Sequence, residues 1–177
     1  GDPRRAMTSW KATANAHEVN ASIMDGACLT LDEIQEADSW EIHDFVYMFS
    51  DGEGKKRQKR SKNELRDTRR WQATLLSSGE NTAVEEVGPE QVQGGFTTRL
   101  IDLRIQQGEG TETGRHAVEI ERFLTRNHGS VWRRWIKRIM DRDMDGLRDT
   151  YDRIGDRLAE GLNSGENVRI CQQFGGV

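Results

Sequence analysis

The sequence predicts an α/β protein, with a parallel sheet in its first part and helices after it. Three apolar stretches, residues 27–31, 71–76 and 97–105, have the length and composition of buried strands. Long helical or loop segments separate them, and parallel strands need connections of that kind. Beyond the third stretch, apolar residues recur at helical spacing. We therefore expect a sheet of at least three strands within residues 1–110 and a helical region in residues 111–177.

Two helices are expected between the first strands. Residues 12–24 favour helix, and Asp25-Gly26 then stops it. Asp38 is followed three residues later by Glu41, a spacing that resembles a capping box at the start of a second helix. That helix is expected to end at residues 51–52 and to bury an apolar face made of Ile42, Phe45, Val46 and Phe49.

The helical region shows three apolar stripes. The first is closed by His128-Gly129. Trp132 and Trp135 belong to the second stripe, and at this spacing we expect them in a core rather than on a platform that stacks nucleic-acid bases. The stripes consist of Ala117, Ile120, Phe123 and Leu124; of Val131, Trp132, Trp135, Ile136 and Ile139; and of Leu147, Tyr151, Ile154, Leu158 and Leu162.

Composition sets broad limits on the class of protein. Hydrophobic residues make up 34% of the chain and charged residues 32%, which is too apolar and too patterned for a disordered chain. No stretch approaches the roughly 18 apolar residues of a membrane span, so no membrane partner is expected. Cys28 and Cys171 lie far apart and fit no metal or redox spacing, which favours a reducing, cytoplasmic compartment.

A pair of carboxylates, Asp32 and Glu33, follows the first apolar strand directly. In nucleotide hydrolases a strand-end aspartate holds magnesium and the next carboxylate activates the attacking water. The alternative is a polar strand end that caps the following helix. Nucleotide hydrolases of this kind also carry a phosphate loop, G-x-x-x-x-G-K-[ST], and this sequence contains none.

Ser77-Ser78 and Arg99 are further candidates. The serines end the second strand, where a small polar side chain could sense a γ-phosphate or the attacking water, although serines before a glycine are also ordinary turn residues. Arg99 lies inside the third expected strand, where a guanidinium needs an anion. That anion is either an internal carboxylate such as Asp102 or a phosphate on a neighbouring subunit.

A basic run between the first two strands contrasts with the formal net charge of −4 for the whole chain. Such a local excess is typical of a site that binds a phosphate backbone, and the alternative is a solvated loop. Only Glu64 and Asp67 oppose the basic residues, which are Lys55, Lys56, Arg57, Lys59, Arg60, Lys62, Arg66, Arg69 and Arg70.

Taken in order, several segments resemble one known family. They are "TSWKATANAHE", "LTLDEIQEAD", "VYMFSDGEGKKR", "RRWQATLLSSGE", "GGFTTRLIDLRI" and "NHGSVW". The chain is similar to the helicase-like ATPase domain of bacterial, plasmid and phage primase–helicase proteins, catalogued as a domain of unknown function. The resemblance implies the P-loop NTPase fold of AAA+ and hexameric helicase ATPases, with a phosphate loop (Walker A motif) just upstream of "GDPRRAMTSW".

The resemblance also implies roles for individual residues. Asp32 matches the magnesium-binding aspartate and Glu33 the catalytic glutamate. Ser78, with Ser77 as the alternative, matches the polar sensor of the next strand. Arg99 occupies the place of the finger that reaches a neighbour's nucleotide. The DNA-contacting hairpin of related helicases corresponds to the basic run, with Lys55, Lys56, Arg57, Lys59 and Arg60 as its candidate contacts.

Two functions are consistent with these patterns. The first is an ATP- and Mg²⁺-dependent helicase or translocase, associated with a primase, that works as a homo-oligomeric ring, a hexamer by resemblance, on single-stranded DNA of a mobile element. This chain would then be a fragment without the phosphate loop and inactive alone. The second is a module that binds nucleic acid or assists assembly and keeps the fold without nucleotide chemistry. Departures from the family pattern are the missing phosphate loop, a denser basic run around "GEGKK" and a weakly matching C-terminal part.

Overall fold

The structure of the chain is a computed structural model that describes residues 7–57, 67–105, 114–127 and 129–174. It divides into two compact units, Asp2–Leu103 and Arg104–Val177, and each is described by itself. The predicted domain boundary after residue 110 lies outside the described residues.

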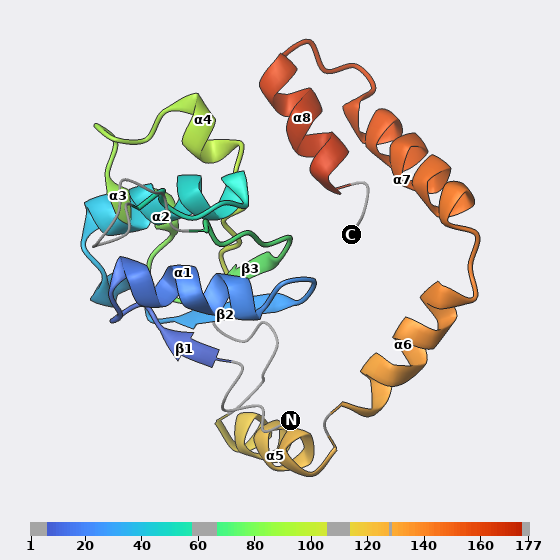
Figure 1. Cartoon of the computed structure of the whole chain (residues 1–177), viewed down its shortest axis with the longest axis horizontal. Coiled ribbons are helices and arrows are strands. Elements are labelled where there is room, and N and C mark those ends of the chain that lie inside the picture. The colour runs from blue at the N-terminus through green and yellow to red at the C-terminus, as the bar shows by residue number, and fades with distance from the viewer. Residues whose placement is uncertain (1–6, 58–66, 106–113, 128, 175–177) are drawn as a thin grey trace. The chain divides into compact units, whose positions relative to one another are not determined.

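The first unit contains a three-stranded parallel sheet with the order β1-β2-β3 (Figure 1). Its strands are β1 (Met7–Ser9), β2 (Cys28–Asp32) and β3 (Thr74–Ser77). The predicted strand at residues 27–31 is confirmed as β2, and the one at residues 71–76 as β3, which begins three residues later than expected. The parallel α/β class is therefore confirmed. The three residues of β1 are too short for any apolar periodicity, and the sequence did not predict this strand.

The third predicted strand, residues 97–105, is wrong. Residues Gly94–Thr97 form the short helix α4, and the chain that follows as far as residue 105 has no strand pairing. Phe96 is fully buried and anchors this segment in the core, whereas Leu103 is 80% exposed. The carboxylate of Asp102 accepts hydrogen bonds from the backbone N–H groups of Ala83 and Val84 at the start of helix α3. The segment is thus held by helices and adds no strand to the sheet.

The two helices predicted between the first strands are confirmed as α1 (Ala14–Ile23) and α2 (Ser39–Asp51). The 3₁₀ helix η2 (Ile34–Glu36) and helix α3 (Ala83–Val87), which follows β3, were not predicted. Asp38 occupies the N-cap position of α2 as predicted, but its side chain makes no capping hydrogen bond. Gly52 ends α2 in the left-handed conformation, with φ at 68°, which glycine adopts without steric cost.

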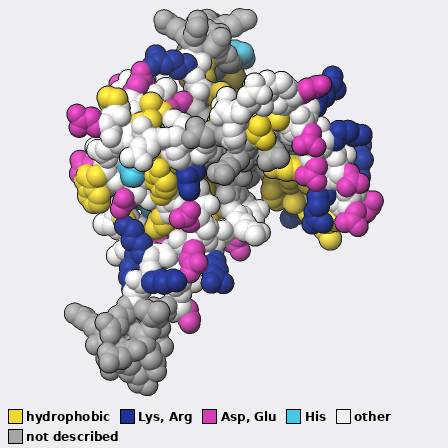
Figure 2. Space-filling model, turned by 90° about the horizontal axis from the view of Figure 1, so that it is seen from above, with side chains coloured by type: hydrophobic (Ala, Val, Ile, Leu, Met, Phe, Trp, Pro, Cys, Tyr) yellow, Lys and Arg dark blue, Asp and Glu magenta, His cyan; other side chains and the backbone are white. Residues whose placement is uncertain are grey.

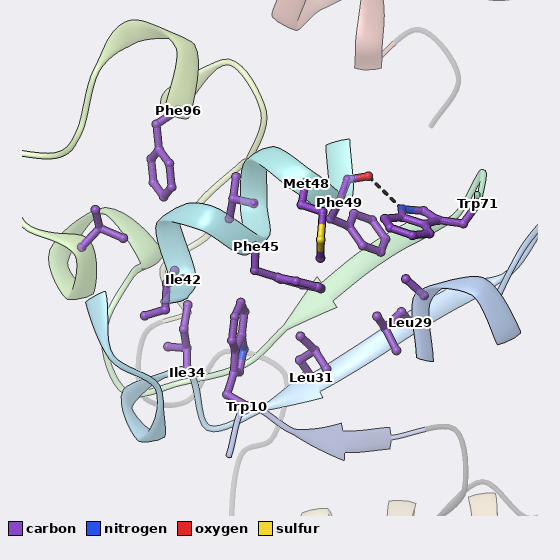
Figure 3. Close-up of a cluster of buried hydrophobic side chains, with 13 residues drawn as sticks. Trp10, Leu29, Leu31, Ile34, Ile42, Phe45, Met48, Phe49, Trp71 and Phe96 are labelled. Atoms are coloured by element: carbon purple, nitrogen blue, oxygen red, sulfur yellow. Dashed lines mark hydrogen bonds between the residues drawn. The ribbon is translucent and has the colours of Figure 1, made fainter. Parts of the chain in front are cut away.

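The core of this unit lies between the sheet and helix α2 (Figure 3). Leu29 and Leu31 of β2 are buried, while Cys28 is exposed, because side chains alternate between the two faces of a strand. The predicted apolar face of α2 is confirmed as buried. Trp10 packs edge-on against Phe45 with ring centroids 5.3 Å apart, so the residue just after β1 closes one end of the core.

The second unit is helical, as expected. Its helices are α5 (Gly114–Arg126), α6 (Ser130–Met140), α7 (Met144–Ala159) and α8 (Gly165–Phe174). The apolar stripes do not form a buried core among the described residues: Trp132 and Trp135 are 53% and 49% exposed and stack on one another at 5.1 Å. The expectation of a core position for these two tryptophans is therefore wrong. In the part of the chain that the structure describes, no helix is long and apolar enough to cross a membrane.

Candidate functional site

The carboxyl ends of β2 and β3 bring the predicted polar residues together. The two strands are parallel, with Leu31 beside Ser77, so the residues that follow them emerge at the same edge of the sheet. The Ser78 hydroxyl donates a hydrogen bond to Oδ1 of Asp32. The sequence placed Asp32 and Ser78 at the ends of two parallel strands, and the structure brings their side chains into contact. Their roles stay predictions.

Ser77 and Ser78 differ in their surroundings. Ser77 lies on the side of the sheet that faces the core, and its Oγ accepts a hydrogen bond of 2.9 Å from the indole Nε1 of the buried Trp10. Ser78, one residue later, lies on the other side with Asp32. Strand alternation thus separates the two candidates that the sequence could not distinguish. Ser77 is exposed but bonds to the core residue Trp10, and Ser78 is the serine at the carboxylates.

Glu33 adopts an uncommon backbone conformation. Its φ and ψ are 61° and 63°, and among the described residues it is the one non-glycine residue with positive φ. This left-handed turn leaves Glu33 exposed while the next residue, Ile34, is 4% exposed and enters the core. Such a conformation costs on the order of 1–3 kcal/mol and persists where the surroundings enforce it.

The loop after β3 enforces this turn. The backbone N–H of Ile34 donates to the carbonyl of Ser78 at 3.0 Å, and the N–H of Ser78 donates to the carbonyl of Leu31 at 3.0 Å. A Cβ on Gly79 would lie only 2.4 Å from Cγ2 of Ile34, so this close approach requires glycine. Glu33 is therefore held beside Asp32 and Ser78, with its carboxylate free of any partner among the described residues.

The donor set at this edge fits a magnesium ion that also binds phosphate. Magnesium in nucleotide sites takes one or two carboxylates and completes its octahedron with water and substrate phosphates. Asp32 and the Ser78 hydroxyl provide such ligands, and Glu33, the next residue in the chain, adds a second carboxylate nearby. A site made of protein ligands alone does not fit, because the described residues include no group of three or more histidine, cysteine, aspartate or glutamate side chains that could hold a metal.

Arg99 has internal partners. Its guanidinium lies over the ring of Tyr47, 4.5 Å from the centroid, and Nη1 donates to the carbonyl of Gly95 at 2.6 Å. Nη2 is 4.0 Å from Oδ1 of Asp51. The internal carboxylate that the sequence left open is thus Asp51 and not Asp102, and Arg99 lies after α4 and not in a strand. A contact with a neighbouring subunit's nucleotide stays a prediction that no observation tests.

Only part of the basic run lies within the described residues, namely residues 55–57 and 67–70. Lys59 and Arg60, predicted to contact nucleic acid, lie outside them. Lys55 pairs with Asp44 at 3.1 Å on the surface, where both side chains are about half exposed. Lys56 is exposed. On the face seen in Figure 2, basic and acidic side chains are interspersed, so the described surface shows no separate basic field on that side.

Arg57 differs from the two lysines because it binds a buried carboxylate. Its Nη1 and Nη2 atoms lie 3.0 and 2.7 Å from Oε1 and Oε2 of Glu18, which is 2% exposed. Nη2 also donates to Oδ1 of Asn15 at 2.6 Å. The sequence did not point to Glu18, since a single glutamate in a helix gives no signal of burial. Arg57 was expected on a solvated loop or at a DNA backbone, and the structure instead pairs it with an internal carboxylate.

Comparisons with known proteins agree with this arrangement at the level of the fold. The model of a family described as "Domain of unknown function (DUF927)" matches residues 1–70, which include Asp32, Glu33 and Lys55. No curated protein matches the chain. A solved structure described as "SCCmec type IV Cch - active helicase" is similar over 97% of this chain, with a TM-score of 0.70 and 18% sequence identity. The likeness shows a shared fold. This chain spans 30% of the length of that structure.

Proposed function

We propose that this chain is the magnesium-binding and DNA-contacting part of an ATP-dependent helicase or translocase. The observation that carries the proposal is the edge where Asp32, Glu33 and Ser78 meet at the carboxyl ends of two parallel strands. The fold that the chain shares with a protein described as an active helicase supports it. From the family resemblance we further infer a homo-oligomeric ring, a hexamer, that acts with a primase on a mobile element.

Each residue at the edge has a distinct task in this proposal. Asp32 would hold magnesium, and the Ser78 hydroxyl would orient either the carboxylate or the attacking water. Glu33, fixed in its left-handed turn and free of partners among the described residues, would accept a proton from that water. Bound Mg·ATP would supply the phosphoryl group and the charge that these residues orient. ATP would lie between subunits of the ring.

The phosphate loop would come from another part of the polypeptide, because the printed sequence contains none. Among the described residues β3 is an edge strand, with β2 on one side and no strand on the other. A further parallel strand beside β3 would deliver its carboxyl end next to Ser78. A phosphate loop at that end would place its backbone N–H groups around the nucleotide's phosphates.

The two serines provide a test of this site. In the longest natural polypeptide that contains this chain, Ser78→Ala should lower the rate of ATP hydrolysis by roughly tenfold or more, since it removes the hydroxyl at Asp32. Ser77→Ala should leave the rate of the folded protein close to wild type, because Ser77 bonds to Trp10. A Ser78→Ala variant with unchanged kcat and unchanged magnesium dependence would contradict the proposed site.

The DNA-contacting part has a separate test in residues 1–177. For single strands the slope of log affinity against log salt is roughly −0.7 per phosphate contact. Replacing Lys55 and Lys56 with alanine should therefore weaken binding of single-stranded DNA for all sequences and flatten the slope by roughly 1.4 units. Arg57 is excluded from this variant because it holds Glu18. Unchanged affinity and slope would show that the basic run is a solvated loop.

A further inference from the structure

Glu18 lies in helix α1 and is only 2% exposed. It is not part of the sheet edge that carries Asp32, and the proposed chemistry does not use it. A buried carboxylate is costly unless paired and hydrogen-bonded. Arg57 meets this need with a bidentate fork, at 3.0 and 2.7 Å. A second guanidinium, that of Arg69, lies 3.8 Å from Oε1 of Glu18. One carboxylate therefore binds two arginines that are twelve positions apart in the chain.

Two paired legs of chain lie beside these arginines: Arg69 belongs to one leg, and Arg57 follows the other by three residues. Residues 52–54 and 69–71 run antiparallel, with a bridge between Glu53 and Arg70. The N–H of Gly54 donates to the carbonyl of Arg69 at 2.9 Å, and the N–H of Trp71 donates to the carbonyl of Gly52 at 3.0 Å. The first leg begins directly after helix α2 and the second ends before β3. The basic run starts after the first leg, at Lys55, and ends in the second leg with Arg69 and Arg70.

Glycine at position 54 brings the first leg against the carboxylate. A Cβ at this position would lie 2.4 Å from Oε1 of Glu18 and 2.6 Å from its Cδ. The backbone of Gly54 thus covers the carboxylate from one side while Arg57 binds it through its side chain. Glu18 therefore contacts the first leg at Gly54, binds Arg57 just after that leg, and reaches the second leg through Arg69.

We propose that Glu18 is a positioning residue, a clamp that holds both legs against helix α1. Residues 52–71, which comprise the two legs and the chain that connects them, are called the basic segment. Arg57 and Arg69 are committed to this clamp, so that Lys55 and Lys56 are the described lysines of the basic run presented to a phosphate backbone. The proposal deepens the DNA-contacting part of the proposed function and rests on it. By charge alone, losing a carboxylate near a basic segment would strengthen binding of DNA. The proposal predicts the opposite for Glu18: its loss should weaken binding.

The test compares Glu18→Gln with Asp44→Asn in residues 1–177. Both variants remove one carboxylate that pairs with the basic segment, but Asp44 pairs with Lys55 on the surface. Affinity for a fluorescent oligothymidine is measured at a temperature at which circular dichroism shows each variant folded. We expect Glu18→Gln to bind roughly tenfold more weakly than wild type, which equals about 1.4 kcal/mol. Asp44→Asn should bind as tightly as wild type or more tightly.

A second readout does not depend on DNA. Hydrogen exchange at the amides of Gly54 and Trp71 reports the pairing of the legs. In Glu18→Gln these two amides should lose protection, while the amide of Ser78, bonded to Leu31 in the sheet, should keep it. If Glu18→Gln does not fold, Arg57→Lys takes its place: it keeps the charge and loses the fork, so the same loss of protection is expected.

The outcomes separate the clamp from the proposed function. If wild type binds no oligothymidine, the DNA-contacting part of the proposed function fails, and exchange at Gly54 and Trp71 alone decides the clamp. Unchanged protection of both amides in Glu18→Gln overturns the clamp. So does an affinity equal to or above wild type in that variant, because charge and not position would then govern binding.

Discussion

Ser77 and Ser78 are neighbours in sequence, but their side chains lie on opposite faces of the sheet. The hydroxyl of Ser77 accepts from the buried indole of Trp10, whereas that of Ser78 donates to Asp32 near the surface. Ser77 is itself exposed, but removing its oxygen takes the hydrogen-bond partner from the indole N–H of Trp10, a residue that is 2% exposed. An unsatisfied donor there costs about 1–3 kcal/mol. Removing that of Ser78 affects an exposed group, and such changes stay within about 0.5 kcal/mol.

We therefore predict different stabilities for two single variants. Ser77→Ala should lower the free energy of unfolding by about 1–2 kcal/mol, and Ser78→Ala by less than about 0.5 kcal/mol. Urea denaturation of residues 1–177 measures both, with unchanged m-values as the control for a two-state comparison. Equal losses in the two variants would contradict the assignment of Ser77 to the fold and Ser78 to the site.

His17 is a buried residue whose charge state should make stability depend on pH. Its ring packs against those of Trp10 and Phe45, and its Nε2 is 3.2 Å from the carbonyl of Trp10. Burial lowers its pKa, although the Trp10 carbonyl and the charge of Glu41 act in the other direction. Nδ1 has no hydrogen-bond partner among the described residues, which agrees with a neutral ring.

The sign of the effect follows from this lowered pKa. In the unfolded chain His17 binds a proton near pH 6.5, and in the folded chain it does so only at lower pH. The free energy of unfolding is therefore unaffected by His17 above about pH 6.5 and decreases as the pH falls below it. The slope reaches at most about 1.4 kcal/mol per pH unit. We predict that His17→Gln flattens the loss between about pH 7 and pH 5.5, as measured by urea midpoints. A wild-type-like pH profile in this variant would assign the effect to other groups.

At the scale of elements, helix α2 passes into the first leg of the basic segment at Gly52. Its φ of 68° favours glycine, and a Cβ there would also lie 2.9 Å from the carbonyl of Trp71. Gly26 has a similar φ of 71°, but a Cβ at that position would meet nothing within 4 Å. The two glycines therefore separate the cost of the left-handed backbone from the cost of the close approach between the legs.

We predict that Gly26→Ala lowers the free energy of unfolding by about 1–2 kcal/mol, the cost of a left-handed residue with a Cβ. Gly52→Ala should cost more than Gly26→Ala, because the second leg must also move. It should moreover raise exchange at the amide of Trp71, which donates to the carbonyl of Gly52. Chemical denaturation and hydrogen exchange of both variants test this; a smaller loss in Gly52→Ala would show that the legs yield without cost.

Sequence patterns predicted the elements whose signal is local. The apolar face of α2 and the strand β2 combine periodicity with clear stop residues, and both are confirmed. The strand predicted at residues 97–105 failed because apolar content alone does not decide pairing: Phe96 and Asp102 tie that segment to helices. Strand β1 has three residues and no periodicity, and only its partner β2 makes it a strand.

The candidate site was predictable in part for the same reason. Asp32 and Ser78 follow two strands, and parallel pairing brings such positions together. The burial of Glu18, by contrast, depends on Arg57, which binds its carboxylate, and on Gly54, whose backbone lies against it. Both are far from Glu18 in sequence, so no local pattern indicates its burial. The choice between Ser77 and Ser78 required the face of the strand, which the position of Trp10 decides.

At the scale of the whole molecule, the sheet edge and the basic segment lie in one compact unit, and the phosphate loop is absent from the sequence. Residues 1–177 therefore lack the backbone amides and lysine that hold the β- and γ-phosphates. We predict no measurable ATP hydrolysis by these residues alone, in a phosphate-release assay with magnesium. Steady hydrolysis that Glu33→Gln abolishes would reveal a phosphate site built from other residues of this chain.

The central claim is that Glu33, held beside Asp32 and Ser78, activates water in a magnesium–nucleotide site. Glu36 provides a matched control: it lies three residues later in η2 and bonds to Ser9 on the surface. The decisive measurement is single-turnover ATP hydrolysis by the longest natural polypeptide that contains this chain. We predict that Glu33→Gln binds Mg·ATP and hydrolyses it at least about 100-fold more slowly, while Glu36→Gln matches wild type. Equal rates for wild type and Glu33→Gln would contradict this claim.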